Sequence, residues 1–415
     1  MKKLIALALA AVLCLCACAA LAADLKVGVI LIGDETEGYT LAHMNGIKEA
    51  AANLGMADNQ IIWKYTVPED QSCYDAAYDL YDQGCKLIIS NSYGHQTYMD
   101  LAAEELSDAT FVSMTGDFAA VSGKDNLKNA FTKVFQARYV SGVVAGMKLA
   151  ELLDSGVLTP DVQPDSFDAD GNVKIGYVGA FDYAEVISGF TSFFLGVRSV
   201  VPNVVMEVNY TGSWFDIMKE GVAAEDLIAK GCVIIGQHAD STGAPAATQA
   251  QLDAGKICYS VGYNIDMIPT APTAALTSPT NGWSVYYTEL FNAMMNGEEI
   301  PVDWAKGFDA DAVGITPLGE SVAEGTAEKV AEVEAALKDG SLKVFDTATF
   351  TVNGETVTSA TINLSFIDFS TMTVVYEGEE VEAIVDGAFA ESEFRSAPYF
   401  TLIIDGITEN KAGLQ

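Results

Sequence analysis

The sequence predicts an α/β protein with two Rossmann-like lobes, each built on a parallel sheet, and a β-rich C-terminal extension. Three observations predict this fold. Short apolar runs, as expected of strands covered on both faces, alternate with segments of helical period in two successive series. A long helical segment, ARYVSGVVAGMKLAELL, separates the two series. After about residue 345 this alternation stops and shorter segments of period two take over.

The first series starts with the apolar run LKVGVILIG, which predicts a buried strand. A helix is then expected from Thr40, with Met44, Ile47 and Leu54 along one side, and it ends at Gly55. Three more strands are predicted from the runs NQIIWKYTV, KLIISNS and TFVSMTG, with helical segments between them. These units form the first lobe.

The second series starts after the long helix. Its strands are predicted from VKIGYVGAF, VVMEVNYTG, CVIIGQHA and KICYSVGYN, again with helical segments between them. Gly142 and Gly146 lie one turn apart in the long helix, which indicates close packing against another helix. Repeated βα units in two runs therefore predict two parallel-sheet lobes.

The C-terminal extension, residues 346–415, has no crossover helices. Asn353-Gly354 between alternating segments is a strong hairpin signal. The run MTVVYEGEEVEAIV predicts a second hairpin. We interpret this part as an accessory β region packed on one lobe, not as a catalytic domain.

The N-terminal residues 1–23 have the pattern of a secretory signal peptide, with two lysines followed by a long apolar run. Two cleavage points stay open. LCAC places Cys18 as the lipidated residue of a lipoprotein, whereas ALA before Ala23 fits ordinary cleavage. After this segment no apolar stretch is long enough to span a membrane. We therefore expect an exported protein, either periplasmic or held at the membrane by a lipid on Cys18.

Charge and motifs exclude several classes of function. The formal net charge is −35 with 22 Lys and Arg residues, which argues against nucleic acid as a partner. No nucleophile elbow, zinc-protease motif, P-loop or dinucleotide fingerprint is present, so we expect no catalytic residues, no cofactor and no enzyme activity. Four cysteines outside the export segment have no metal-ligand spacing, so no metal site is predicted. They are either buried hydrophobic residues or disulfide partners: Cys73, Cys85, Cys232 and Cys258.

Polar and aromatic residues recur directly after the predicted strands. In open α/β sheets ligands bind outside the carboxyl ends of the strands, so these loops predict a cleft between two facing lobes. The alternative is that such loops carry Gly and Asp only to cap the next helix. The loops are GDETEGY at 33–39, NSYGH at 91–95, TGDF at 115–118, AFDY at 180–183, TGSWFD at 211–216, QHADSTG at 237–243 and YNIDM at 263–267.

Several segments resemble the basic membrane protein (BMP) family, among them KIGYVGAFDYAEVISGFTSFFLGVRSV, VVMEVNYTGSWFDIMKEGVAAEDLIAKGCVIIGQHADSTG and YSVGYNIDM. Its members are substrate-binding lipoproteins of ABC transporters, similar to purine-nucleoside-binding proteins. The resemblance implies a type I periplasmic binding protein whose lobes close on a ligand, with a permease and an ATPase as partners. It places residues 24–135 and 268–304 in the N-terminal lobe and residues 136–267 and 305–345 in the C-terminal lobe.

The resemblance also implies site residues. Counting back from Gly46, Tyr39 takes the place of an aromatic that stacks on a base, and Thr40 that of the Asn beside it. Asp117 would grip the edge of the ring, and Trp214 would be the second stacking aromatic. Phe181 and Gly243 complete the candidates from the loops AFDY and QHADSTG.

The loop YNIDM departs from the family pattern. Where the family reads Gly-Val-Asp-Ser-Asp-Gln, this chain keeps the second acid as Asp266 but has Asn264 in place of the first, which would hold ribose hydroxyls. An amide can still bind a hydroxyl, though without charge assistance. The usual Lys is also missing, since Asn281 takes its place. A nucleoside is the expected ligand, but a modified nucleoside or a sugar, a sensory receptor role, and a capped turn at Asn264 stay open.

Overall fold

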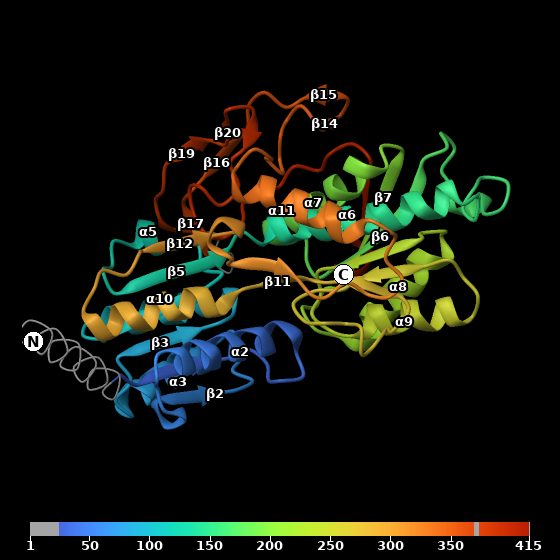
Figure 1. Cartoon of the computed structure of the whole chain (residues 1–415). Helices are drawn as coiled ribbons and strands as arrows, with labels where there is room; N and C mark the ends of the chain where they lie inside the picture. The colour runs from blue at the N-terminus through green and yellow to red at the C-terminus, as the bar shows by residue number, and fades with distance from the viewer. Residues whose placement is uncertain (1–24, 369–372, 415) are drawn as a thin grey trace, which may run out of the picture.

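The computed structural model describes residues 25–368 and 373–414 and contains the two parallel sheets expected from the sequence (Figure 1). The signal-peptide and lipidation predictions, including Cys18, lie outside the described residues. The first sheet has six strands in the order β12-β5-β4-β3-β1-β2, and all of its pairs are parallel. Its strands are β1 (Val27–Ile30), β2 (Ile61–Lys64), β3 (Leu87–Ser90), β4 (Thr110–Met114), β5 (Leu127–Thr132) and β12 (Asp303–Lys306).

Helices cover both faces of the first sheet, which explains why its strands are continuous apolar runs. The helix α2 packs against α10, and α3 packs against α4. Asp70 fixes the start of α3, because its carboxylate accepts a hydrogen bond from the Ser72 backbone N–H at 2.8 Å. The helices of this lobe are α2 (Gly38–Asn53), α3 (Gln71–Asp82), α4 (Gln96–Glu105), α5 (Ala119–Ser122) and α10 (Trp283–Asn296).

The second sheet also has six parallel strands, in the order β10-β9-β8-β6-β7-β22. Its strands are β6 (Val173–Gly179), β7 (Val204–Tyr210), β8 (Ile234–Gln237), β9 (Tyr259–Val261), β10 (Ala275–Thr277) and β22 (Ile407–Asn410). The helices of this lobe are α6 (Val134–Asp154), α7 (Ala184–Val200), α8 (Ile217–Ala229), α9 (Gly243–Asp253) and α11 (Thr326–Lys338).

The helices α6 and α7 approach closely where the sequence predicted close packing at Gly142 and Gly146. A Cβ on Gly142 would lie 2.1 Å from the Phe193 carbonyl oxygen. A Cβ on Gly146 would lie 2.9 Å from the Val200 Cβ. Only glycine therefore allows the two helices to pack at this distance.

Three connections join the lobes, and two of them differ from the expected boundaries. The first leads from β5 directly into α6, as expected. The second follows β10, which belongs to the second sheet although the predicted boundary at residue 268 assigned it to the first lobe. The third leaves the first sheet only after β12 ends at Lys306. The last two connections pair as an antiparallel ribbon of β11 (Pro279–Asn281) and β13 (Val313–Ile315).

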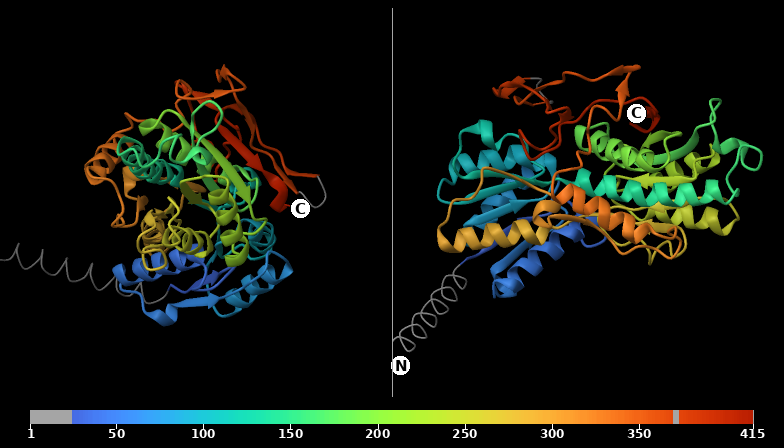
Figure 2. Two further views of the ribbon diagram at one scale, coloured as in Figure 1. Left: turned by 90° about the vertical axis from the view of Figure 1, so that its right-hand side faces the viewer. Right: turned by 45° about the horizontal axis from the view of Figure 1, so that its top comes forward.

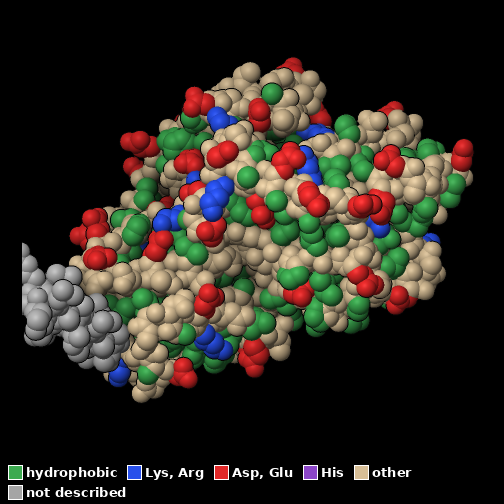
Figure 3. Space-filling view, in the orientation of Figure 1, with side chains coloured by type: hydrophobic (Ala, Val, Ile, Leu, Met, Phe, Trp, Pro, Cys, Tyr) green, Lys and Arg blue, Asp and Glu red, His purple; other side chains and the backbone are tan. Residues whose placement is uncertain are grey.

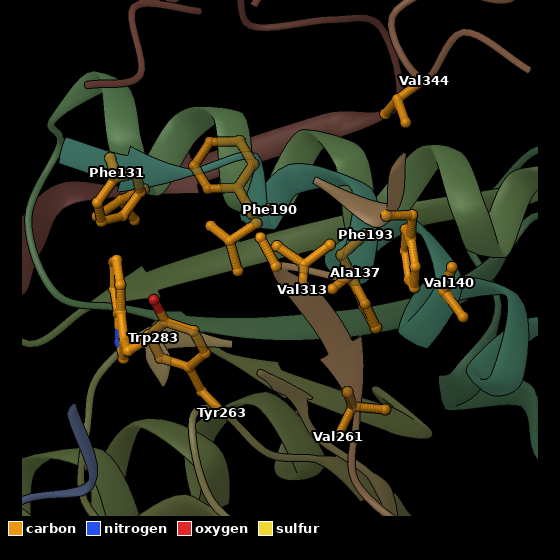
Figure 4. Packing of buried hydrophobic residues seen from close by; sticks show 14 of the residues in the cluster. Phe131, Ala137, Val140, Phe190, Phe193, Val261, Tyr263, Trp283, Val313 and Val344 are labelled. Carbon is orange, nitrogen blue, oxygen red and sulfur yellow. The ribbon is translucent and has the colours of Figure 1, made fainter. Parts of the chain in front are cut away.

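A buried aromatic group fills the space near these connections. Figure 4 shows Tyr263, which follows β9 of the second lobe, next to Trp283 at the start of α10 in the first lobe. Phe131 lies 5.8 Å from Trp283, measured between ring centroids. All three side chains belong to one hydrophobic cluster that runs through both lobes. The connections are therefore packed, not solvated linkers.

The C-terminal extension lies across both lobes on one side of the molecule (Figures 1 and 2). The expected hairpin at Asn353-Gly354 is confirmed, with both residues at positive φ between β14 and β15. The second expected hairpin is wrong, because β18 pairs with β17 and β19 pairs with β16, as the arms of one longer hairpin. The strands are β14 (Thr351–Val352), β15 (Glu355–Thr356), β16 (Thr361–Asn363), β17 (Phe366–Asp368), β18 (Thr373–Tyr376), β19 (Glu380–Glu382), β20 (Ile384–Val385) and β21 (Ala388–Phe389).

Other features of the described residues bear on the sequence analysis. The cysteines Cys73, Cys85, Cys232 and Cys258 are all buried and free. Within residues 25–368 and 373–414 no helix has the length and apolarity to cross a membrane. The same residues contain no group of His, Cys, Asp or Glu arranged to hold a metal ion. Acidic side chains are scattered over the face shown in Figure 3.

Candidate functional site

A cavity lies between the lobes, at the carboxyl ends of strands from both sheets. The first lobe contributes Glu37, Tyr39 and Asn91, and the second contributes Trp214, Asp240 and Tyr263, among others. Its volume is about 40 Å³, because the lobes are in direct contact around it. The Gly38 N–H donates to the Asp240 carbonyl across the cleft at 3.3 Å. We call this space the central cavity.

Gly38 begins α2, and the close contact between the lobes depends on its lack of a side chain. A Cβ at this position would lie 3.1 Å from the Asp240 carbonyl oxygen and 3.5 Å from a side-chain carbon of Ile265. Asp34 shapes the turn just before it, since its carboxylate accepts the Thr36 N–H at 2.9 Å. The loop GDETEGY is therefore built for close approach to the second lobe.

The first-lobe wall is organised around Asn91, which follows β3. Its side-chain oxygen accepts the Ile32 N–H at 2.8 Å, and its amide nitrogen donates to the Thr40 hydroxyl at 3.1 Å. The Tyr39 hydroxyl donates to the Asn91 carbonyl at 2.8 Å. Thr40 also donates to Glu37, whose pKa is raised because burial disfavours its charged form. This network fixes the ring of Tyr39 before any ligand arrives.

Thr115 follows β4 and lines the central cavity with φ at +64°. A β-branched residue rarely adopts positive φ, so the backbone here is strained. Such strain concentrates at ligand sites, where the surrounding structure enforces it.

The second-lobe wall carries an aromatic group. Trp214, from the loop after β7, lies 5.1 Å from Phe181 and 6.1 Å from Tyr183, measured between ring centroids. Asp216 ends this loop by accepting hydrogen bonds from the Met218 and Lys219 N–H groups, which starts α8. The loop after β7 is thus anchored two residues beyond Trp214.

The Asp240 carboxyl projects from the loop after β8, and buried groups hold that loop. The Asp240 N–H donates to the Trp214 carbonyl at 2.7 Å. Both carboxylate oxygens of Glu220 accept the neighbouring Ser241 N–H, at 3.2 and 3.1 Å. Burial raises the pKa of Glu220 to about 7 and raises that of Asp240 well above its usual range. The nearby carboxyls of Glu37 and Glu220 raise the pKa of Asp240 further.

A buried arginine lies behind this wall. Arg138 on α6 is 1% exposed and donates to the Tyr177 hydroxyl at 2.5 Å and to the Gln237 carbonyl at 3.0 Å. Its guanidinium lies 3.9 Å from the ring centroid of Tyr263. Its Nε and Nη2 atoms are buried without a hydrogen-bond partner in the part of the chain that the structure describes. Arg138 supplies the positive field among the carboxyl groups of the cleft.

His238 lies between Arg138 and the cavity, and its Nε2 is 3.2 Å from the Glu185 carboxylate. Burial, and then the Arg138 charge, lower the pKa of His238 to about 4. At neutral pH the ring is therefore uncharged. Its Nδ1 is buried and has no hydrogen-bond partner within residues 25–368 and 373–414.

Asn264 belongs to a chain of hydrogen bonds that crosses the hinge. Its amide nitrogen donates to the Asp240 carboxylate at 2.7 Å, and its oxygen accepts from Asn281 at 3.0 Å. The Thr132 hydroxyl at the end of β5 donates to Asn281 at 2.5 Å. The φ of Asn264 is +62°, a conformation that asparagine tolerates. The two positions that depart from the family pattern, Asn264 and Asn281, therefore contact each other.

Two larger spaces flank the central cavity. One, of about 410 Å³, lies beside Phe181, Trp214 and Thr66. The other, of about 680 Å³, is lined by both lobes and by the C-terminal extension, and we call it the outer chamber. In the outer chamber the Asp117 carboxylate accepts from the Tyr93 hydroxyl at 3.0 Å and lies 3.5 Å from Arg395.

The structure brings some of the expected site residues together and separates others. Tyr39 and Trp214 line the central cavity, Asp117 lines the outer chamber, and Phe181 lines the smaller flanking space. Asn264 reaches the cavity through its bond to Asp240.

Three expected residues lie elsewhere. Thr40 is fully buried behind Tyr39 and supports Asn91. Gly243 starts α9 and allows close packing on α8, since a Cβ there would lie 2.2 Å from the Ile217 carbonyl oxygen. Asp266 is exposed and accepts the Ile268 N–H at 2.9 Å, as in a capped turn. None of the three lines the central cavity or the outer chamber.

Sequence reasoning did not single out several residues that line these spaces. Most lie in the quoted loops, but nothing in the sequence marks which side chain of a loop faces inward. The residues missed are Glu37, Asn91, Tyr93, Glu185, Asp240, Tyr263 and Arg395.

Two α/β lobes with a polar, aromatic cavity at the carboxyl ends of both sheets define a bilobal solute-binding protein. The sequence profile of the Bmp family, described as ABC transporter substrate-binding protein, PnrA-like, matches residues 31–344. The chain belongs to this family of ABC transporter substrate-binding proteins.

Individual relatives agree with this assignment. A purine-binding protein of Brucella abortus (strain 2308) is 30% identical, covering 77% of this chain and 83% of its own length. A Haloferax volcanii protein named as an ABC transporter glucose-binding protein is 28% identical, covering 71% of this chain and 68% of its own. An ABC transporter solute-binding protein structure from Aeropyrum pernix K1 matches with a TM-score of 0.62 at 15% identity, covering 77% of this chain and 93% of its own, and shows the fold alone.

Proposed function

We propose that the cleft binds a nucleoside-like ligand, with a purine nucleoside as the first candidate, and delivers it to the permease of an ABC importer. One observation carries this proposal. Two aromatic residues from opposite lobes, Tyr39 and Trp214, line the same cavity as the carboxyl of Asp240 and the amide of Asn91. Aromatic faces bind a flat base, and carboxyl and amide groups bind hydroxyls.

The central cavity of about 40 Å³ is smaller than the roughly 300 Å³ of ordinary ligand pockets. Ligand entry therefore requires the lobes to separate and close again. The ligand stabilises the closed form by its better contacts there, and that form docks on the permease. The Brucella relative, named as purine-binding, supports a purine.

A sugar is the second candidate, since the same carboxyl and amide groups fit sugar hydroxyls and the Haloferax relative is named as glucose-binding. A receptor subunit that reports ligand binding to a sensor is the alternative role for this fold. We also propose that the protein binds its ligand without chemical change, and that a lipid on Cys18 anchors it outside the cell. Replacing Cys18 with Ala should release the protein from membranes.

The deciding experiment starts from mature protein refolded from denaturant, which removes any carried ligand. Its thermal unfolding is followed with nucleosides, free bases, ribose and glucose. A melting shift that saturates with a nucleoside, as mass action requires, supports the proposal. Shifts with glucose alone would replace it by the sugar candidate. Recovering the ligand unchanged by chromatography tests the absence of catalysis.

A further inference from the structure

The outer chamber has three walls, one of which lies outside the family match. Tyr93, Thr115 and Asp117 come from the first lobe, residues 182–185 and Trp214 from the second, and the remainder from the C-terminal extension. The extension's lining residues are Asn363, Ser365, Phe366, Ile367, Arg395, Ala397 and Pro398. The family profile ends at residue 344, so this third wall is an addition to the two-lobed body.

The outer chamber adjoins the central cavity, because the two share four lining residues: Tyr93, Thr115, Glu185 and Trp214. Its volume of about 680 Å³ falls within the roughly 300–1,000 Å³ typical of small-molecule sites, whereas the central cavity has about 40 Å³. A ligand that enters the central cavity can therefore extend into the chamber beyond Trp214.

The third wall is fixed to the first lobe by specific contacts. The Phe366 ring lies 4.2 Å from that of Phe118, measured between centroids. The Tyr376 hydroxyl donates to Asp100 at 2.7 Å. The Ser396 N–H donates to Asp303 at 2.9 Å.

The same region is also built into the second lobe. Its last strand, β22, pairs with β7 over four residues of each strand. The Tyr210 hydroxyl donates to Glu409 at 2.5 Å. Because the extension is held at both ends, its lining residues keep their places at the mouth of the cleft.

The chamber combines aromatic surface with negative charge. Tyr93, Tyr183, Trp214 and Phe366 supply rings. Three carboxyl groups, from Asp117, Asp182 and Glu185, line the chamber, and two cations lie beside them. Arg395 lies 3.5 Å from Asp117 and Lys411 lies 3.2 Å from Asp182, so the carboxyl groups still exceed these cations by one. An anionic group such as a phosphate is disfavoured there, while hydroxyl and ammonium groups are favoured.

The arrangement also orients a nucleoside. The inner end of the site has the carboxyl of Asp240 and the amide of Asn91, which suit ribose hydroxyls. Trp214 lines both spaces, so a flat base held by Tyr39 and Trp214 lies where the two spaces meet. The far edge of the base then points into the outer chamber.

We propose that the outer chamber, completed by the C-terminal extension, holds an uncharged or cationic substituent on the base of the ligand. The ligand is then a base-modified nucleoside, larger than the central cavity alone could select. This inference rests on the proposed function, since it deepens the specificity of the same site.

The test uses the refolded mature chain and four probes with one nucleoside core: adenosine and its N6-(2-hydroxyethyl), N6-(2-aminoethyl) and N6-carboxymethyl derivatives. Calorimetry should show the hydroxyethyl and aminoethyl probes binding at least as tightly as adenosine. Both should bind about tenfold or more tighter than the carboxymethyl probe, because only the last brings a negative charge to the carboxyl groups.

Equal affinities for the cationic and anionic probes, or weaker binding of every substituted probe than of adenosine, would overturn the inference and leave nucleoside binding intact. Failure of adenosine, guanosine and all substituted probes to bind is a different result. It would remove the proposed nucleoside function and the inference with it.

Variants of the third wall supply a second readout. Arg395→Gln removes the one cation among the chamber's lining residues, so the affinity ratio of aminoethyl to carboxymethyl probe should rise about threefold or more. Val375→Thr, on β18 of the same extension but exposed and outside the lining, should leave this ratio unchanged. If Arg395→Gln unfolds, Asp182→Asn should lower the ratio instead. An unchanged ratio in folded Arg395→Gln overturns the role of the extension, and an unchanged ratio in folded Asp182→Asn overturns the charge selectivity of the chamber.

Discussion

The two walls of the cleft differ in how their polar groups are satisfied. On the first lobe, Asn91 uses its side-chain oxygen, its amide nitrogen and its carbonyl in hydrogen bonds with neighbouring residues. On the second lobe, His238 Nδ1 and the Nε and Nη2 atoms of Arg138 are buried without partners among the described residues. A buried polar atom without a partner costs free energy.

This difference indicates that the two walls have different roles in binding. On the first wall these bonds hold Asn91 and Tyr39 in place without ligand, so this part of the wall acts as a rigid template that orients the ring of Tyr39. The second wall keeps unused hydrogen-bonding capacity around Asp240, and a ligand or water that supplies partners there lowers the free energy of the closed state. Changes to the first wall should mainly reduce stability, and changes to the second should mainly reduce affinity.

The largest expected effect is on the support of the first wall. Trp283 is 1% exposed, stacks on His43 at 4.2 Å between ring centroids, and His43 in turn meets Tyr39 at 4.5 Å. Trp283→Ala should lower the free energy of unfolding by about 3–5 kcal/mol, as for other buried aromatic truncations. Urea unfolding measures this loss of stability. The control is Trp63→Ala, which changes a partly exposed residue in the same lobe. A loss no greater than that of the control would contradict the template role.

The second prediction concerns pH and the loop that carries Asp240. The pKa of Glu220 is raised from 4.5 to about 7 by burial, so its contribution to stability is complete below pH 4.5 and is lost as pH rises through 7. The free energy of unfolding of wild type should therefore fall between pH 4.5 and pH 8 by more than that of Glu220→Gln. The difference between the two falls should be at most about 3 kcal/mol.

Unfolding at a series of pH values measures this difference. Glu225→Gln, at an exposed position on the same helix, should follow the wild-type profile. If the stability of Glu220→Gln changes with pH in parallel with that of wild type, the pKa of Glu220 is the same in the folded and unfolded states.

The third prediction tests the second wall directly. Trp214→Ala should weaken nucleoside binding by about 1–3 kcal/mol, the value of stacking a base on an aromatic ring. Stability should change little, because Trp214 is only partly buried. Met218→Ala, 75% exposed and just beyond the same loop, is the matched control for calorimetry. An unchanged dissociation constant would remove Trp214 from the site.

The sequence predicted most of the strands of the two lobes because they are continuous apolar runs, but it did not predict β5. That strand reads LKNAFT, and its polar residues are buried: Asn129 is 1% exposed and accepts the Ala119 N–H at 2.6 Å. Hydropathy cannot separate such a strand from a loop. The strand β22 was not predicted for another reason. It pairs with β7 across about two hundred residues, and nothing in its own sequence indicates which strand it pairs with.

The site was predicted at the level of loops and not of side chains. In QHADSTG, Asp240 lines the cavity while Gly243 supports helix packing. In YNIDM, the positive φ of Asn264 turns the chain, so Asn264 points inward and Asp266 is exposed. Which residue faces a cleft depends on backbone dihedral angles that a single sequence does not specify.

The smallest expected effect concerns the hinge, where the departures from the family pattern meet. The resemblance implies an acid and a Lys at these two positions, whereas this chain has Asn264 and Asn281, which hydrogen-bond each other at 3.0 Å. Asn264→Asp alone places a second carboxyl 2.7 Å from the Asp240 carboxylate, so it should lower stability as pH rises, when both carboxyl groups lose their protons.

Adding Asn281→Lys should restore part of this loss, with a coupling of about 1 kcal/mol in a double-mutant cycle at pH 8 and less at pH 5. Additive single effects would mean that the two replacements arose at independent positions. A measured coupling would mean that the two positions act as one unit. Because Asn264 also donates to the Asp240 carboxylate, that unit then links the hinge to the wall of the central cavity.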